Sequence, residues 1–214
     1  MAGKKRGEEA PRLKPYMGLA EKLGRLVGQI AGTEIRSIDV EVEGAAAELN
    51  IKPITGAVLA GVMRSWSDTV NMVNAPYLAK ERGLAVREIR NEGEGDYHTL
   101  VAVTVGTEHG PRRVEGTLFG NRAPRLVKIF DIQVEAELAG QMIYIVNDDA
   151  PGFIGALGTK LGDNRINIAT FNLGRQAAGG EAVALVAVDD PISPDVSRQL
   201  HELPGVREVV PLSF

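Results

Sequence analysis

Apolar and polar residues alternate with two different periods along this chain of 214 residues. From Pro11 to Ile30 apolar side chains recur at steps of three and four, the period of a helix with one apolar face. Residues 38–43 instead alternate between apolar and acidic side chains, which predicts a strand with one solvated face. Residues 53–66 and 74–83 return to the helical period, each with a proline near its start. The first part of the chain therefore mixes helices with strands.

Further alternating runs follow this helical stretch, separated by turn-forming residues. A hairpin through Thr107–Gly110 joins two of them. The predicted strands cover residues 84–90, 97–105, 114–118, 126–132 and 134–138. We place a domain boundary at Gly140, so that residues 11–139 form a mixed α/β domain. Residues 1–10, which include the basic run Lys4-Lys5-Arg6, are expected to be a flexible tail.

Residues 140–214 show a second and simpler order of elements. A strand over 141–147 leads to a helix at about 152–162, and strands over 165–173 and 181–188 enclose a turn at 177–180. Ser193 and Pro194 then open a helix over 194–203, before a last strand at 206–212. The order βαββαβ predicts a ferredoxin-like domain. The whole chain is thus expected to have an α+β fold.

Composition narrows the classes of function. The net charge of −4 argues against general binding to nucleic acid or to an anionic membrane surface. The absence of cysteine excludes disulfides, thiolate zinc sites and cysteine nucleophiles. No signal-peptide core follows the basic start, and no run of about 18 apolar residues occurs. We therefore expect a cytoplasmic protein that does not span a membrane.

The segment 145–155 is the strongest candidate for a binding site. An apolar strand ends in an acidic loop, and Pro151 then fits the first turn of a helix whose opening N–H groups have no helical partner. Those amides favour a carboxylate, while Asp149 and the side-chain oxygen of Asn147 suit an ammonium group. The corner is therefore predicted to bind a small zwitterion. Two plainer interpretations are that Asp149 is a solvated loop acid or caps the helix.

Other chemistry finds little support in the sequence. Asp148 and Asp149 lack the partners that a metal site or an acid/base pair needs, and no glycine-rich nucleotide fingerprint follows a strand. The three histidines lack zinc-binding spacing, and they are His98, His109 and His201. We assign no catalytic residue, no metal and no cofactor to the chain. The spacing of Gly155 and Gly158 predicts that their helix packs closely against the sheet.

Four arginines give the first domain a small basic focus. They are Arg112, Arg113, Arg122 and Arg125. Arginine forks suit phosphate or carboxylate groups. A solvated loop with scattered ion pairs is the alternative interpretation.

Several of these segments together resemble the C-terminal regulatory region of long-form D-3-phosphoglycerate dehydrogenase. The likeness rests on segments 8–16, 38–43, 73–76, 116–120 and 147–169, and extends over nearly all of the chain after residue 7. It implies an intervening domain that binds substrate allosterically, followed by an ACT domain that binds L-serine for feedback inhibition. It also implies a homo-oligomer formed through the ACT domains, and NAD binding only in the full-length enzyme. We therefore expect no dehydrogenase activity from this chain alone.

The resemblance also assigns residues. It places Asp149 at the amino group of serine, and it implies that Asn167 reaches the effector from a neighbouring subunit. Asn147 stands where relatives commonly carry histidine or tyrosine. The expected effector site is Asn147, Asp149, Gly152, Phe153, Ile154 and Asn167.

A second, anionic site is expected in the first domain. Arg125 falls at a basic position of the relatives' anion pocket, whereas Glu137 occupies a second basic position. A possible anion site then depends on Arg122 and Arg125. An alternative of a different class is that the region is a constitutive assembly domain without a small-molecule effector.

Overall fold

The computed structural model describes residues 2–93 and 95–214, and within them the side chains from residue 9 onward. The chain divides into two compact units, Met1–Phe130 and Asp131–Phe214. Both units combine helices with antiparallel strands, so the predicted α+β class is confirmed.

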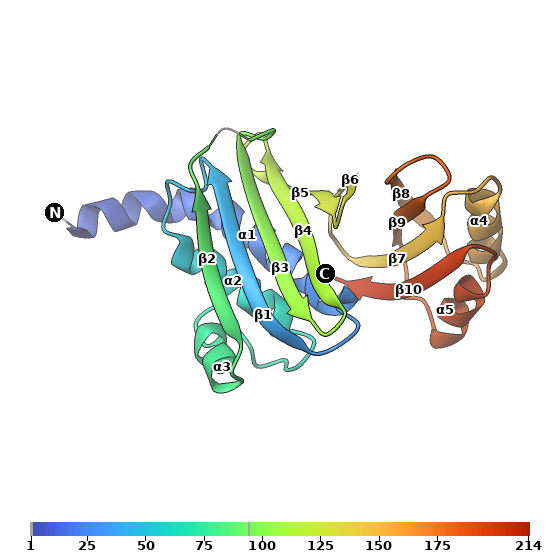
Figure 1. Cartoon of the computed structure of the whole chain (residues 1–214), viewed down its shortest axis with the longest axis horizontal. Helices are drawn as coiled ribbons and strands as arrows, with labels where there is room; N and C mark the ends of the chain where they lie inside the picture. The colour runs from blue at the N-terminus through green and yellow to red at the C-terminus, as the bar shows by residue number, and fades with distance from the viewer. Residues whose placement is uncertain (1, 94) are drawn as a thin grey trace. The chain divides into compact units, whose positions relative to one another are not determined.

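The first unit places its helices on one face of a mixed sheet. The helices are α1 (Ala2–Ile30), α2 (Ile51–Met63) and α3 (Ala75–Glu81). The strands are β1 (Ile35–Gly44), β2 (Ala85–Asn91), β3 (Thr99–Thr107), β4 (Gly110–Phe119) and β5 (Ala123–Ile129), and their order is β2-β1-β3-β4-β5. Strand β2 pairs with β1 in parallel, and the other pairs are antiparallel. Helices α1 and α2 lie behind this sheet in Figure 1.

The alternation in β1 explains why this sheet has one apolar and one polar face. Ile38, Val40 and Val42 are fully buried. The acids between them point to the opposite face, where Arg113 donates to Glu41 at 2.6 Å and to Glu115 on its own strand at 2.7 Å. These ion pairs join β1 to β4, and they let a row of carboxylates lie side by side without mutual repulsion.

Helices α1 and α2 approach each other at glycines. A Cβ added to Gly24 would lie 2.3 Å from the carbonyl oxygen of Val58, and one added to Gly61 would lie 2.3 Å from that of Glu21. No side chain fits at such a distance. The two backbones therefore touch directly, and the apolar residues that flank the glycines form the core beneath the sheet.

The N-terminal boundary differs from the prediction. Residues 1–10 were expected to form a tail, but α1 continues back to Ala2 and contains Pro11 and Pro15. The helix tolerates the two prolines although each removes one backbone hydrogen bond. The side chains of the basic run Lys4-Lys5-Arg6 lie outside the described residues.

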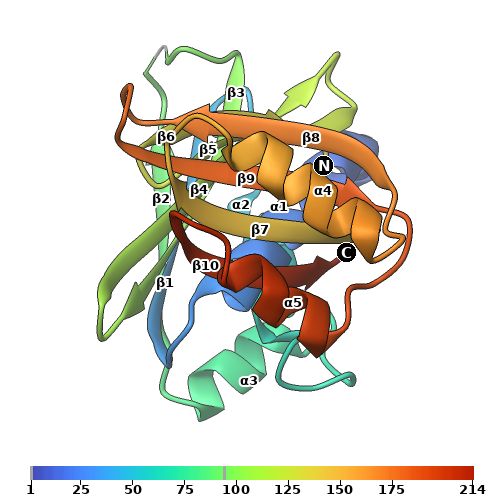
Figure 2. The ribbon, with the colours of Figure 1, turned by 90° about the vertical axis from the view of Figure 1, so that its right-hand side faces the viewer.

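The second unit contains the predicted order of elements. Strand β6 (Ile132–Ala136) precedes β7 (Gln141–Asp148), α4 (Phe153–Asp163), β8 (Ile168–Arg175), β9 (Glu181–Val188), α5 (Pro194–His201) and β10 (Val206–Ser213). Four of these strands form an antiparallel sheet in the order β10-β7-β9-β8. Helices α4 and α5 lie on the same face of it (Figure 2). Their apolar stripes meet the sheet around Ile143, Leu157 and Leu200.

The packing of α4 and the strand boundaries near Phe130 differ from the predictions. The expected close packing of Gly155 and Gly158 is wrong, because a Cβ added at either position would meet nothing within 4 Å. The predicted strands 126–132 and 134–138 are divided differently, since Phe130 turns the chain with a φ of 54° and β6 begins at Ile132. The compact units accordingly separate after Phe130, whereas the sequence placed a domain boundary at Gly140.

Candidate functional site

The candidate site is the corner where β7 ends and α4 begins. Gly152 precedes the helix with a φ of 91°, a left-handed conformation that only glycine adopts without strain. No side chain caps the helix. The first helical hydrogen bond joins the Ala156 amide to the Gly152 carbonyl. Within the described residues, the amides of Ile154 and Gly155 therefore donate to no protein group.

Asn147 lies at the end of β7 with 1% of its surface exposed. Its Nδ2 donates to the backbone carbonyl of Asp148 at 2.9 Å. Its Oδ1 is shielded from solvent and has no hydrogen-bond partner among the described residues. A buried polar atom without a hydrogen bond destabilises the fold by about 1–3 kcal/mol, so a donor that reached this oxygen would remove that cost.

Asp149 is held by the hairpin between β8 and β9. Its Oδ2 accepts from Nη1 of Arg175 at 2.8 Å and from the backbone amide of Gly179 at 3.0 Å. The Arg175 hydrogen bond, followed by the Gly179 amide, holds the pKa of Asp149 below its ordinary value. The other oxygen, Oδ1, accepts no hydrogen bond in the described part of the chain. The Asp149 carboxylate is therefore ionised, and only one of its two oxygens accepts hydrogen bonds within the described residues.

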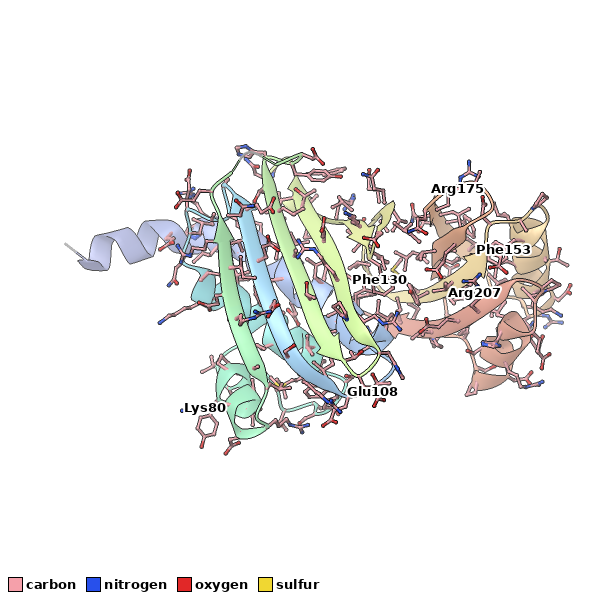
Figure 3. All side chains as sticks on the ribbon, viewed as in Figure 1. Lys80, Glu108, Phe130, Phe153, Arg175 and Arg207 are labelled. Carbon is pink, nitrogen blue, oxygen red and sulfur yellow. The ribbon has the colours of Figure 1, made fainter. Side chains whose placement is uncertain are left out.

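Asp148 points to a different partner. It pairs with Arg207 on β10, which also donates to Glu181 at 3.2 Å. The two neighbouring acids are thus separated by their arginines and do not face a common target. Figure 3 shows Arg175 and Arg207 at the end of the sheet where Phe153 begins α4.

The two apolar residues of the predicted site take opposite positions. The side chain of Phe153 is buried in the core of the second unit and fixes the start of α4. The side chain of Ile154 is 55% exposed. Phe153 can therefore offer a ligand only its backbone, whereas Ile154 offers both a free amide and an apolar surface.

Asn167 lies at the opposite end of the sheet. Its Nδ2 donates to Asp189 at 2.8 Å, and the next residue, Ile168, pairs with Val188. Asn147 pairs with Ala182, about six residues farther along β9. At about 3.3 Å per residue, roughly 20 Å separate the two ends. A single chain therefore brings Asn147, Asp149 and the start of α4 together, but leaves Asn167 apart.

The possible anion site is a short hairpin. Gly120 and Asn121 both have positive φ, and the Arg122 amide donates to the Phe119 carbonyl at 3.2 Å. Arg125 lies with its Cζ 5.9 Å from the centre of the Phe119 ring and donates to the Pro124 carbonyl at 3.0 Å. Arg122 is exposed at the tip. The other two arginines of the basic focus have partners outside this hairpin. Arg113 forms ion pairs with Glu41 and Glu115, and Arg112 stacks over the ring of Phe130.

The sequence reasoning missed Arg175, Gly179 and Arg207, which hold the two loop acids. Arg175 ends β8 just before a glycine-rich turn, a position that gave a weak signal. Arg207 gave none, because its contact with Asp148 depends on the pairing of β10 with β7.

The described side chains, those of residues 9–93 and 95–214, include no group of three or more metal-ligating residues that could hold an ion. Across the same residues, no helix is long and apolar enough to cross a membrane.

Comparison with known proteins identifies the family. The D-3-phosphoglycerate dehydrogenase intervening domain matches residues 12–130. The D-3-phosphoglycerate dehydrogenases of Bacillus subtilis and Archaeoglobus fulgidus are each 34% identical, over 94% and 91% of this chain and 39% and 37% of their own length. That of Synechocystis is 32% identical, over 92% of this chain and 36% of its own. The chain thus spans between 36% and 39% of these relatives. Because the matched domain covers more than half of the chain, this protein belongs to the D-3-phosphoglycerate dehydrogenase intervening-domain family.

Proposed function

We propose that this chain is a regulatory, serine-sensing region of a D-3-phosphoglycerate dehydrogenase. In this proposal residues 140–214 form an ACT domain, and the effector binds where β7 meets α4. The observation that carries it is the set of unused groups at this corner: two free amides, a buried amide oxygen and a half-engaged carboxylate. These are the complements of a carboxylate and an ammonium group.

The proposed binding mode follows from those groups. The carboxylate of L-serine accepts from the amides of Ile154 and Gly155, where the helix also carries partial positive charge. The ammonium group donates to Oδ1 of Asp149. Asn147 supplies a second acceptor, which the ligand reaches only when the amide turns outward, because Oδ1 is shielded in the free chain.

A second copy of the chain completes the site. Strand β8 is an edge of its sheet, and exposed edges invite pairing with another strand. If two β8 strands pair antiparallel about their midpoint, residue 167 of one copy lies opposite residue 176 of the other. That arrangement brings Asn167 beside Arg175, the partner of Asp149. An effector bound by both copies would stabilise the pair.

Calorimetric titration with L-serine tests this site. The parent should release heat with saturation, and ligand at about 100 times its dissociation constant should raise the unfolding free energy by about 2.7 kcal/mol. Asp149→Ala and Asn167→Ala should each abolish the heat without unfolding the chain. Asp163→Ala, which removes an exposed acid at the far end of α4, is the matched control. Unchanged heat for either site variant would show that the site is misassigned.

Mixing the two inactive variants tests whether the site is shared. In a heterodimer one site carries both substitutions and the other carries neither. An equimolar mixture should therefore recover about a quarter of the parent binding capacity. No recovery would mean that Asp149 and Asn167 do not act across two copies.

One observation favours the alternative of a constitutive assembly domain. Arg175 and the Gly179 amide already compensate the charge of Asp149, so the corner is partly satisfied without a ligand. Under this alternative the chain associates in the same way with and without amino acids, and calorimetry shows no heat. Both proposals place the oxidation of 3-phosphoglycerate outside this chain, and turnover of NAD by purified 1–214 would overturn that assignment.

A further inference from the structure

The first unit contains a cavity that the proposed function does not use. It has a volume of about 350 Å³ and is lined by Thr33, Glu34, Ile35, Trp66, Arg82 and Leu84. These residues follow the C-terminal ends of α1, α2 and α3. A volume of this size accommodates a small metabolite.

The cationic wall of the cavity is a stacked pair. Trp66 is fixed by its backbone amide, which donates to the Met63 carbonyl at 2.9 Å just after α2. Arg82 ends α3, and its Cζ lies 5.1 Å from the centre of the Trp66 ring. Stacking uses the face of the guanidinium and leaves the N–H groups at its edge for a planar anion. The ion pairs between described side chains do not include Arg82.

The opposite charge is present in the same cavity. Glu34 is exposed and forms no ion pair among the described residues. Thr33 lies just past the end of α1, where the unpaired carbonyls of a helix carry partial negative charge. The shielded hydroxyl of Thr33 has no hydrogen-bond partner in the part of the chain that the structure describes, and rotation about its side-chain bond can turn it toward a ligand. Cationic and anionic groups therefore flank one small space.

The remaining lining is apolar. Ile35 is 4% exposed, and Trp66 and Leu84 are partly buried. A purely polar ligand would leave the exposed parts of Trp66 and Leu84 in contact with water, whereas an apolar side chain would cover them. A separate, smaller cavity of about 90 Å³ is also lined by Trp66 and Arg82, together with apolar residues that include Met63, Val70 and Leu78.

We infer that this cavity binds an α-amino acid with an apolar side chain. Its carboxylate accepts hydrogen bonds from the N–H groups at the edge of Arg82, its ammonium group donates to Glu34, and its side chain covers Trp66 and Leu84. The site is independent of the serine site proposed above, because all of its residues belong to the first unit.

Trp66 makes the test direct, since it is the only tryptophan in the chain. L-leucine should change its fluorescence with saturation, and calorimetry should give the same dissociation constant. Leucinamide lacks the carboxylate and 4-methylpentanoate lacks the ammonium group, so each should bind about tenfold more weakly or worse. Equal binding of all three, or no saturable signal with L-leucine at millimolar concentrations, would overturn the proposal.

Substitutions of Arg82 and Glu34 test the two proposed charge contacts with the ligand. Arg82→Met keeps the apolar stem and should weaken L-leucine about tenfold, and Glu34→Gln should weaken it several-fold. Arg36→Met makes the same replacement at an exposed arginine outside the cavity and should leave affinity unchanged. Should Arg82→Met fail to fold, Glu34→Gln and the two leucine analogues still decide the question. Asp149→Ala should retain L-leucine binding, so failure of one site is distinguishable from failure of the other.

Discussion

The two units use glycine in opposite ways on their longest helices. In the first unit, Gly24 and Gly61 let α1 and α2 touch along their backbones, with no room for even a methyl group. In the second unit, a Cβ added to Gly155, Gly158 or Gly162 of α4 would meet nothing within 4 Å. In the first unit α1 and α2 cover each other's glycines, whereas no described residue lies against the glycines of α4.

The contrast shows what glycine spacing does and does not reveal. Gly24 and Gly28 on α1 are four residues apart, and Gly155, Gly158 and Gly162 on α4 are three and four apart, so each set lies on one helix face. Whether a neighbour fills that face depends on which element packs there. In α4 the core is made by Phe153, Leu157 and Leu161, which are buried on the opposite side from the open glycines.

The largest effect is expected at the closed helix pair. Gly24→Ala would place a methyl carbon 2.3 Å from the Val58 carbonyl oxygen, so the two helices must separate. We expect a loss of about 3 kcal/mol in the unfolding free energy, measured by urea denaturation with Trp66 fluorescence. Gly18→Ala on the same helix meets nothing within 4 Å and serves as the control. A cost below that of an ordinary surface substitution would contradict the contact between α1 and α2.

A smaller effect of opposite sign is expected on α4. Gly158→Ala meets no neighbour, and alanine is favoured over glycine inside a helix by about 0.5–1 kcal/mol. The chain should therefore become more stable, as followed by far-UV circular dichroism during thermal unfolding. Destabilisation accompanied by a change in oligomeric state would instead mean that another copy packs on this face.

The smallest effect is the change in stability expected when the pH is lowered. The pKa values of Asp149 and Asp195, both in the second unit, are lowered by hydrogen bonds from Arg175 and Arg198 respectively. A carboxyl group with a lowered pKa in the folded state stabilises the fold above its unfolded pKa of about 4, and the contribution is lost as the pH falls through the folded value. The advantage of the parent over Asp149→Asn in melting temperature should therefore shrink below about pH 4. Asp163→Asn is the control, and a constant difference from neutral to acid pH would contradict the ion pair.

Much of the second unit was predictable because each helix or strand has a regular hydrophobic periodicity and ends at turn-forming or capping residues. The strand over 181–188 was predicted with its observed bounds, and Ser193 caps α5 as expected by accepting from the Val196 amide at 3.2 Å. Local hydrogen bonds and burial of one face determine such elements, and both are visible in the sequence.

The remaining features depend on contacts between distant residues. Ile129 and Ile132 are both buried although they are three residues apart, and the chain turns at Phe130 between them. In the site, the acids and the helix start were found, but the arginines that hold the acids come from other strands. The partner of Asp149 is known only once the hairpin of β8 and β9 has folded back over it.

Asn147 and Asn167 stand at opposite ends of one sheet, about 20 Å apart along its strands. An amino acid is far too short to span that length, so a ligand that contacts both residues must join two molecules. Its apparent affinity then rises with the amount of protein present. Under the proposed function, dilution alone would weaken serine binding, and the concentration of the protein would set the serine concentration at which the shared site fills.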